Sequence, residues 1–111
     1  MKKLFISQPM RDKTDEEIKS ERKEIIEKVE KILGEEVEVI DSFFEKAPHD
    51  AKPLWFLGKS IELLASADIA YFANKWYKYR GYRIEHICCT NYGINTILYS
   101  DPEVFTNKKE N

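Results

Sequence analysis

The fold is decided by the stretch Ala67-Asp68-Ile69-Ala70-Tyr71-Phe72-Ala73, with Gly81-Tyr82-Arg83-Ile84-Glu85-His86 a few residues further on. The first part is almost wholly apolar, as is typical of a strand in a parallel sheet that helices cover on both faces. The second part has the features of a first helical turn after a loop. In open α/β sheets, ligands bind between the end of a strand and the helix that follows it. We therefore predict a functional site at this junction, with Glu85 as its reactive carboxylate.

Outward from this stretch, short apolar runs alternate with amphipathic segments. Thr14 and Glu17 form a capping box for a helix that Gly34 ends. Strands are expected at 3–6, 36–41, 68–73 and 94–99, and helices over 14–33, 54–66 and 82–91. The helix over 54–66 is expected to turn one side to the core, with Leu54, Leu57, Ile61, Leu64 and Ala65 on it.

This alternation predicts right-handed crossovers and a parallel sheet. We expect residues 1–111 to form one α/β domain, a three-layer Rossmann-like (flavodoxin-like) sandwich with four to five strands. Residues 101–111 are expected to add a short helix or strand before a polar, frayed tail that begins at about residue 106.

The composition is that of an ordinary globular domain, with 111 residues, 42% of them hydrophobic and 34% charged. A net charge of −2 offers no broad basic surface, so no nucleic-acid polymer is expected as a partner. No apolar run approaches the roughly 20 residues that span a bilayer, so no membrane is expected either. The apolar start ends at Ser7, which is too short for a signal peptide and favours a cytoplasmic location.

Cofactor and metal motifs are missing from the sequence. The glycine fingerprint for dinucleotides and the phosphate loop of ATPases are both absent, which argues against either class of enzyme. Cys88 and Cys89 are adjacent in a predicted helix, where they point about 100° apart and do not bridge. His49 and His86 are isolated. We expect neither a metal nor a cofactor.

Glu85 is the main candidate for chemistry. In a first helical turn, the positive end of the helix dipole would keep its carboxylate ionised. An ionised carboxylate suits a nucleophile better than a general acid, which must hold its proton near neutrality. The alternative is ordinary, because acidic residues are common in first helical turns for dipole reasons alone.

The segment between the strand and this helix is unusually aromatic, and we expect it to be a mobile loop. Trp76, Tyr77 and Tyr79 offer flat faces for a nucleobase, and its cations, Lys75, Lys78 and Arg80, are suited to a phosphate. The same residue types are enriched in subunit interfaces, and this alternative stays open.

The ends of the first two strands face the same mouth of the sheet. Ser7, Gln8, Pro9 and Met10 follow the first strand, where backbone amides, a hydroxyl and an amide can hold a sugar or phosphate. A plain turn into the capped helix is the alternative. Asp41 ends the second strand and is expected at this mouth, whereas Asp68 is expected at the opposite edge of the sheet as a turn residue.

Three motifs resemble those of the nucleoside 2-deoxyribosyltransferase-like superfamily, and most closely its short branch from bacteria and phages. They are Phe5-Ile6-Ser7-Gln8-Pro9-Met10, Ala67-Asp68-Ile69-Ala70-Tyr71-Phe72 and Gly81-Tyr82-Arg83-Ile84-Glu85. The Trp, Arg-Gly and Glu-His run of that branch is present as Trp76, Arg80-Gly81 and Glu85-His86.

The resemblance implies cleavage or transfer of an N-glycosidic bond, with Glu85 attacking the anomeric carbon and Gly81 four residues before it. It also implies a homo-oligomer whose subunits share active sites. The chain departs from the transferases where Tyr79 and Arg80 replace an aspartate, which changes sugar recognition and protonation of the leaving base. Arg80 favours a nucleotide over a nucleoside. The tyrosine that transferases carry at the first strand is missing as well, with Ser7 and Gln8 in its region.

Two other functions stay open. The same pocket could bind a nucleotide-derived small molecule without turning it over. Alternatively, Trp76, Tyr77 and Tyr79 could serve self-association only.

Overall fold

A computed structural model describes residues 1–10, 12–42 and 47–107. Within them, four parallel strands form one sheet in the order β2-β1-β3-β4. The strands are β1 (Lys2–Ser7), β2 (Val37–Val39), β3 (Ile69–Phe72) and β4 (Asn95–Leu98), and the helices are α1 (Asp15–Leu33), α2 (Pro53–Leu64) and α3 (Arg80–Tyr92), with a 3₁₀ turn η1 (Trp76–Lys78). This confirms the predicted α/β class and the parallel sheet.

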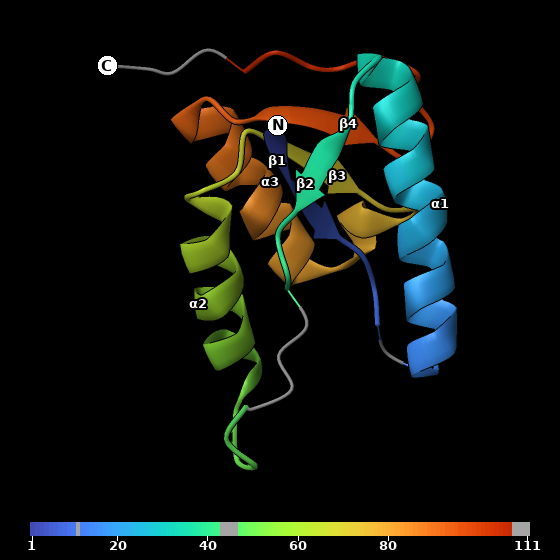
Figure 1. The fold of residues 1–111 in the computed structure, drawn as a ribbon. Helices are drawn as coiled ribbons and strands as arrows, with labels where there is room; N and C mark the ends of the chain where they lie inside the picture. Colours follow the sequence, from blue (N-terminus) through green and yellow to red (C-terminus); the bar gives the residue numbers. More distant parts are fainter. Residues whose placement is uncertain (11, 43–46, 108–111) are drawn as a thin grey trace.

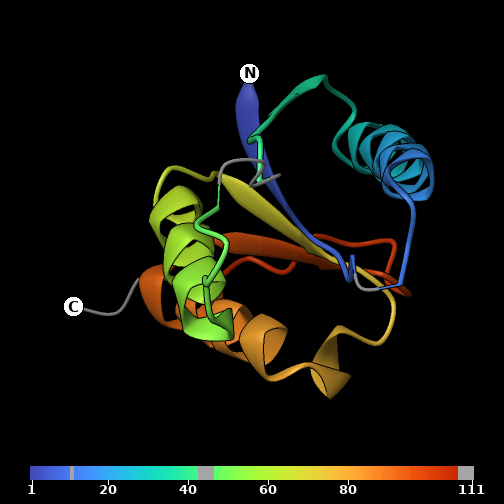
Figure 2. The same cartoon turned by 90° about the horizontal axis from the view of Figure 1, so that it is seen from below.

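The helices cover the sheet from both sides. Helix α1 lies over one face, while α2 and α3 lie side by side over the other (Figures 1 and 2). Because side chains alternate along a strand, Leu4 and Ile6 of β1 pack toward α1, and Phe5 between them packs toward α2 and α3. The predicted three-layer sandwich is therefore the observed architecture.

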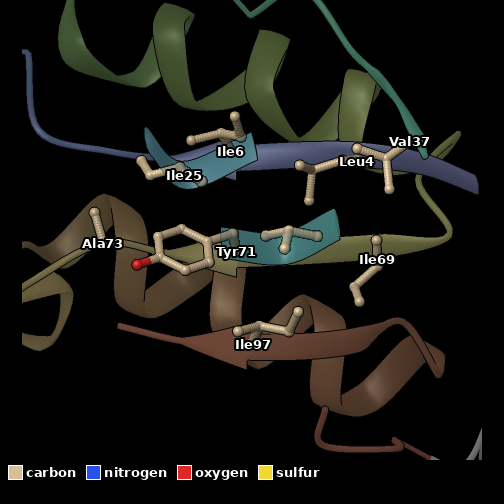
Figure 3. Packing of buried hydrophobic residues seen from close by; sticks show 9 residues of the cluster. Leu4, Ile6, Ile25, Val37, Ile69, Tyr71, Ala73 and Ile97 are labelled. Carbon is tan, nitrogen blue, oxygen red and sulfur yellow. The ribbon is translucent and has the colours of Figure 1, made fainter. Parts of the chain in front are cut away.

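The larger core cluster lies between the sheet and α1. Figure 3 shows Leu4, Ile69, Tyr71 and Ile97 from adjacent strands in one layer, with Ile25 of α1 against them. A smaller cluster on the other face joins Phe5, Leu64, Ala70, Phe72 and Cys89. Phe5 of this smaller cluster also borders a cavity next to α2 and α3.

Helix α1 begins and ends where its sequence predicts. The Glu17 backbone N–H donates to Thr14 Oγ1 at 3.1 Å, and the Glu17 side chain accepts in return from the Thr14 backbone. Gly34 follows the helix with a φ of 70°, a left-handed conformation that glycine adopts without steric cost. At the opposite edge of the sheet, Asp68 accepts a hydrogen bond from the Lys3 backbone N–H at 2.8 Å, as expected for a turn residue.

Three sequence-based expectations need correction. The aromatic segment before α3 contains the ordered turn η1, and α3 begins at Arg80 instead of near residue 82. Glu85 is therefore in the second turn of the helix. On α2, Leu54 is 76% exposed and Ile61 is also exposed, so the helix turns a different side to the protein interior. The side of α2 that faces the interior is the one that carries Leu64, which is buried against Phe5.

The C-terminal segment adds a single antiparallel bridge between Phe105 and Thr96 of β4. Asn107 is hydrogen-bonded to Asn95 and to the backbone of Ile94. The end of the predicted polar tail, residues 108–111, lies outside the described residues. Cys88 and Cys89 are both free thiols, as predicted. None of the helices in the described ranges has the length and apolar character needed to cross a membrane.

Candidate active site

A cavity of about 840 Å³ opens at the carboxyl end of the sheet, on the side of α2 and α3. This volume lies in the range of small-molecule sites. Residues from the end of β1, the N-terminal half of α2 and the start of α3 form its walls, among them Ser7, Met10, Phe56, Leu57, Arg80, Gly81, Tyr82 and Glu85. We call it the Glu85 cavity. Its place agrees with the general rule for ligands in open α/β sheets.

Glu85 and Ser7 bring two buried oxygen atoms to this cavity. Glu85 is 3% exposed and Ser7 is 2% exposed. Neither Glu85 Oε1 nor Ser7 Oγ has a hydrogen-bond partner of normal geometry among the described residues. Buried polar atoms without a partner are rare in native proteins and cost free energy. A ligand in the cavity would supply the missing partners.

Burial controls the charge of Glu85. Removal from water raises the pKa of its carboxyl from 4.5 to about 7, and the nearby Ser7 hydroxyl opposes part of this rise. The expectation that the helix dipole keeps Glu85 ionised is therefore wrong. The dipole acts within the first turn, whereas Glu85 is the sixth residue of a helix that starts at Arg80. Near neutral pH, protonated and ionised forms coexist.

Gln8 is buried beside Ser7, but its side chain points to the other face of the sheet. Its Nε2 donates to Glu21 at 3.1 Å, and its Oε1 accepts from Arg22 Nε at 2.9 Å. Its backbone oxygen accepts from the Tyr82 hydroxyl at 3.0 Å. Gln8 thus links β1 to α1 and α3, with its amide engaged on the side of α1.

Arg22 connects the segments that follow β1 and β2. No motif in the sequence predicts this role for Arg22. It donates to Gln8 and to the hydroxyl of Ser42, which is buried at the edge of the Glu85 cavity. Burial lowers the pKa of the Arg22 guanidinium, and the charge of Asp41 opposes that change. Asp41 is exposed and does not line the cavity.

The rim of the cavity is formed by the start of α3. Lys78, Arg80 and Gly81 lie there, and no side chain caps the first backbone N–H groups of the helix. These groups and the cations favour an anion at the rim. Burial, together with the charges of Glu85 and Tyr79, raises the pKa of the Tyr82 hydroxyl to about 12, so it remains a donor.

Two further candidate residues lie away from the Glu85 cavity. The Trp76 ring stacks on His86, with a distance of 4.4 Å between ring centroids, and also contacts Phe72. Pro9 lines a separate cavity of about 450 Å³ on the side of α1. Six of the predicted site residues line the Glu85 cavity. Ser7, Gln8 and Met10 come from the end of β1 and the loop after it, and Arg80, Gly81 and Glu85 come from α3.

Helix α2 contributes a wall to the cavity that was not predicted from the sequence. Pro53, Phe56, Leu57 and Ser60 all line the Glu85 cavity. Their spacing of i, i+3, i+4 and i+7 is that of one helix face, and it continues to the buried Leu64. The signal was present but ambiguous, because Leu54 and Ile61 give this short helix a second apolar side.

Chemically, the cavity joins a buried carboxyl group, a free hydroxyl group and an apolar wall to a cationic rim. No group of His, Cys, Asp or Glu within the described ranges is arranged to hold a metal ion. Neither a protein-family model, a curated protein nor a solved structure matches this chain.

Proposed function

We propose that this protein cleaves or transfers the N-glycosidic bond of a deoxynucleoside or nucleotide, with Glu85 as the nucleophile. The observation that carries the proposal is the pair of buried, unpartnered oxygen atoms of Glu85 and Ser7 at one cavity. The resemblance of residues 5–10, 67–72 and 81–85 to the nucleoside 2-deoxyribosyltransferase-like superfamily supports it further.

In the first step, the Glu85 carboxylate attacks the anomeric carbon of the sugar. A carbon–oxygen bond to Glu85 forms while the bond to the base nitrogen breaks, and the base leaves with that electron pair and takes a proton from solvent. Water in a hydrolase, or a ring nitrogen of a second base in a transferase, then attacks the anomeric carbon. The bond from this carbon to Glu85 breaks with its electron pair returning to the carboxylate, and the incoming group gives up its proton to solvent. Both routes restore the Glu85 carboxylate.

The electrostatics of the cavity suit this reaction. The transition state of glycoside cleavage has oxocarbenium character, and an anionic carboxylate beside it is stabilising. In a site shielded from water, that attraction is stronger than on the surface. The ionised form of Glu85, present at and above a pH of about 7, is the reactive one.

The other cavity residues would position the substrate. The free hydroxyl of Ser7 is suited to a sugar hydroxyl, and Arg80 with the first N–H groups of α3 is suited to a phosphate. Trp76, which the sequence suggested as a cover for the base, lies outside the Glu85 cavity and supports His86 instead.

The proposal is tested by incubating the protein with deoxynucleosides and their 5′-monophosphates and measuring the free base by chromatography. We expect release by the unmodified chain and none above background by Glu85→Gln. Glu27→Gln, at an exposed position of α1, is the matched control and should keep full activity. Base release that is unchanged in Glu85→Gln would remove Glu85 from the mechanism.

A binding module that does not turn its ligand over is the second candidate. It is favoured by one observation: among the described residues lining the cavity, Glu85 is the sole carboxylic acid, so none of them offers a second carboxyl group to protonate the leaving base. Thermal-shift measurements with the same compounds separate the two functions. A higher melting temperature without released base would support the binding module.

We also propose that the chain forms a homo-oligomer. Apolar side chains are exposed on the outer sides of α2 and α3, with Leu54 76% exposed and Ile87 55% exposed. In a homo-oligomer, exposed apolar side chains such as these are buried in the contact between subunits. Analytical ultracentrifugation measures the number of subunits, and a monomer at all concentrations would contradict this proposal.

A further inference from the structure

We propose that a second cavity, on the α1 face of the sheet, binds a small organic anion through an ammonium group and a phenol hydroxyl. This α1 cavity has a volume of about 450 Å³, which is within the size range of small-molecule sites. It is separate from the Glu85 cavity and takes no part in the proposed reaction. Its walls include Pro9, Ile25, Lys28, Tyr71, Lys75 and Tyr99.

The α1 cavity lies at the carboxyl edge of the sheet, where the loops after the neighbouring strands β1 and β3 separate. The loop after β1 leads to α1 on one face, and the loop after β3 leads to α3 on the other (Figures 1 and 2). Open α/β sheets bind ligands in the crevice at such a point of divergence. Pro9 of the first loop and Ala73 and Asn74 of the second border the α1 cavity. The topology therefore provides a second crevice on the face opposite to the Glu85 cavity.

Lys28 of α1 brings to this crevice a positive charge that pairs with no carboxylate among the described residues. Its ammonium donates to the Tyr99 backbone oxygen and lies 5.3 Å from the ring centroids of both Tyr71 and Tyr99. Glu24 is one helical turn earlier, at the spacing where glutamate and lysine usually pair, yet the ion pairs of the described ranges do not include Lys28. The two tyrosine rings thus hold the ammonium at the cavity without a counter-ion.

The Tyr71 hydroxyl is a second donor next to this ammonium. Lys28 Nζ lies 3.5 Å from the Tyr71 hydroxyl oxygen, which accepts from it and keeps its own hydrogen for another acceptor. Burial, together with the charge of Tyr99, raises the pKa of Tyr71 to about 12, so this hydrogen is retained at neutral pH. Figure 3 shows the hydroxyl on the side of Ala73, which lines the α1 cavity. The two donors are therefore close enough to bind one anionic group.

The remaining walls suit the other part of such a ligand. Ile25 is apolar, and the half-exposed ring of Tyr99 offers an aromatic face. Lys75 adds a further ammonium group, while Lys13 is neutralised by Glu21, with 2.6 Å between the charged atoms. Three lysines against two glutamates leave one positive charge on the described lining, although the whole chain carries −2. The α1 cavity therefore favours a small anion with an apolar or aromatic body.

The test is a titration followed by NMR of the isoleucine and leucine methyl groups. The probes are phenyl phosphate and benzoate, with benzylamine as a cation of similar size. We expect both anions to shift the Ile25 signals saturably and benzylamine to leave them unchanged. Leu57 lines the Glu85 cavity and reports on that site. Anions that shift Leu57 but not Ile25, or benzylamine that binds as tightly as the anions, would overturn the proposal.

Variants of the two donors identify the binding groups. Lys28→Met keeps the aliphatic stem but loses a charged donor, so it should weaken both anions at least about tenfold. Tyr71→Phe removes the hydroxyl alone and should weaken them about threefold or more. Lys31→Met, at an exposed position of α1 away from the cavity, is the matched control and should bind like the unmodified chain. Anion affinity that is unchanged in Lys28→Met, or lost equally in Lys31→Met, would show that the α1 cavity is not the site.

This proposal and the proposed reaction fail in different ways. Glu85→Gln should bind both anions at Ile25 as tightly as the unmodified chain does, whether or not that chain releases base. If base is released and neither anion shifts Ile25, the anion site is wrong and the reaction stands. If no base is released and the affinity at Ile25 depends on Lys28, the reaction is wrong and the anion site stands.

Discussion

The hydroxyl of Ser7, the last residue of β1, and the carboxyl of Glu85, in the second turn of α3, are buried at the same cavity with one unpartnered oxygen atom each. Leaving a buried polar group unpaired costs about 1–3 kcal/mol. Proteins commonly keep such a cost where function needs it, and stabilising replacements there reduce activity.

Replacement of Glu85 by Gln should stabilise the protein at high pH. Because burial raises the pKa of Glu85 from 4.5 to about 7, the folded state holds its proton more tightly than the unfolded state. Stability is therefore lost as the pH rises from about 4.5 to about 7, by roughly 3 kcal/mol in total. Glu85→Gln removes this loss, so its melting temperature should exceed that of the unmodified chain at pH 8.

The difference between the two proteins should shrink as the pH falls toward 5, where Glu85 is protonated in the folded state. Thermal melts at several pH values measure it, with the exposed Glu27→Gln as the control that should show no such trend. A melting-temperature advantage for Glu85→Gln that grows toward acidic pH would contradict burial as the cause.

Replacement of Ser7 by Ala should raise the pKa of Glu85 further. The Ser7 hydroxyl is the one influence that lowers this pKa, and its removal leaves burial unopposed. Stability should change by no more than about 1 kcal/mol, because the hydroxyl makes no hydrogen bond of normal geometry and only its weak interaction with the Glu85 carboxyl is lost. Carbon NMR of the Glu85 carboxyl follows the titration directly, and an unchanged or lower pKa would show that the Ser7 hydroxyl does not act on it.

Replacement of Gly81 by Ala should stabilise α3 and weaken ligand binding. A Cβ at Gly81 meets no heavy atom within 4 Å, and the substitution reduces the freedom of the unfolded chain, a gain of about 0.4–1 kcal/mol. The added methyl group would occupy space at the rim of the Glu85 cavity, where a phosphate is expected to approach. Urea unfolding and ligand titration test the two parts separately, and an unchanged ligand affinity would show that the rim is not used.

Replacement of Trp76 by Ala should destabilise the protein without affecting ligands of the Glu85 cavity. The Trp76 ring stacks on His86 and contacts Phe72, and its loss should cost roughly 1–3 kcal/mol. Burial lowers the pKa of His86, so opening this contact should move it back toward its ordinary value. Proton NMR of the imidazole measures the pKa. Loss of ligand affinity in folded Trp76→Ala would place this ring at the ligand after all.

The sequence alone predicted the architecture, because its signals are local. The capping box of Thr14 and Glu17 and the glycine at 34 fix the ends of α1 through hydrogen bonds between residues close together in the sequence. The apolar run of β3 requires cover on both faces wherever it lies in the chain. Period-two alternation also places Ser7 with Phe5 and turns Gln8 to the other face.

Only the tertiary structure decided the chemistry of the site. The pKa of Glu85 depends on how completely β1 and α2 exclude water from it, and Trp76 lies against His86 because η1 folds back on α3. Local patterns identify residues that suit a helix or a strand. How far a side chain is removed from water, and which side chains it contacts, depends on segments that are distant in the sequence. Both are therefore decided only when the chain is folded.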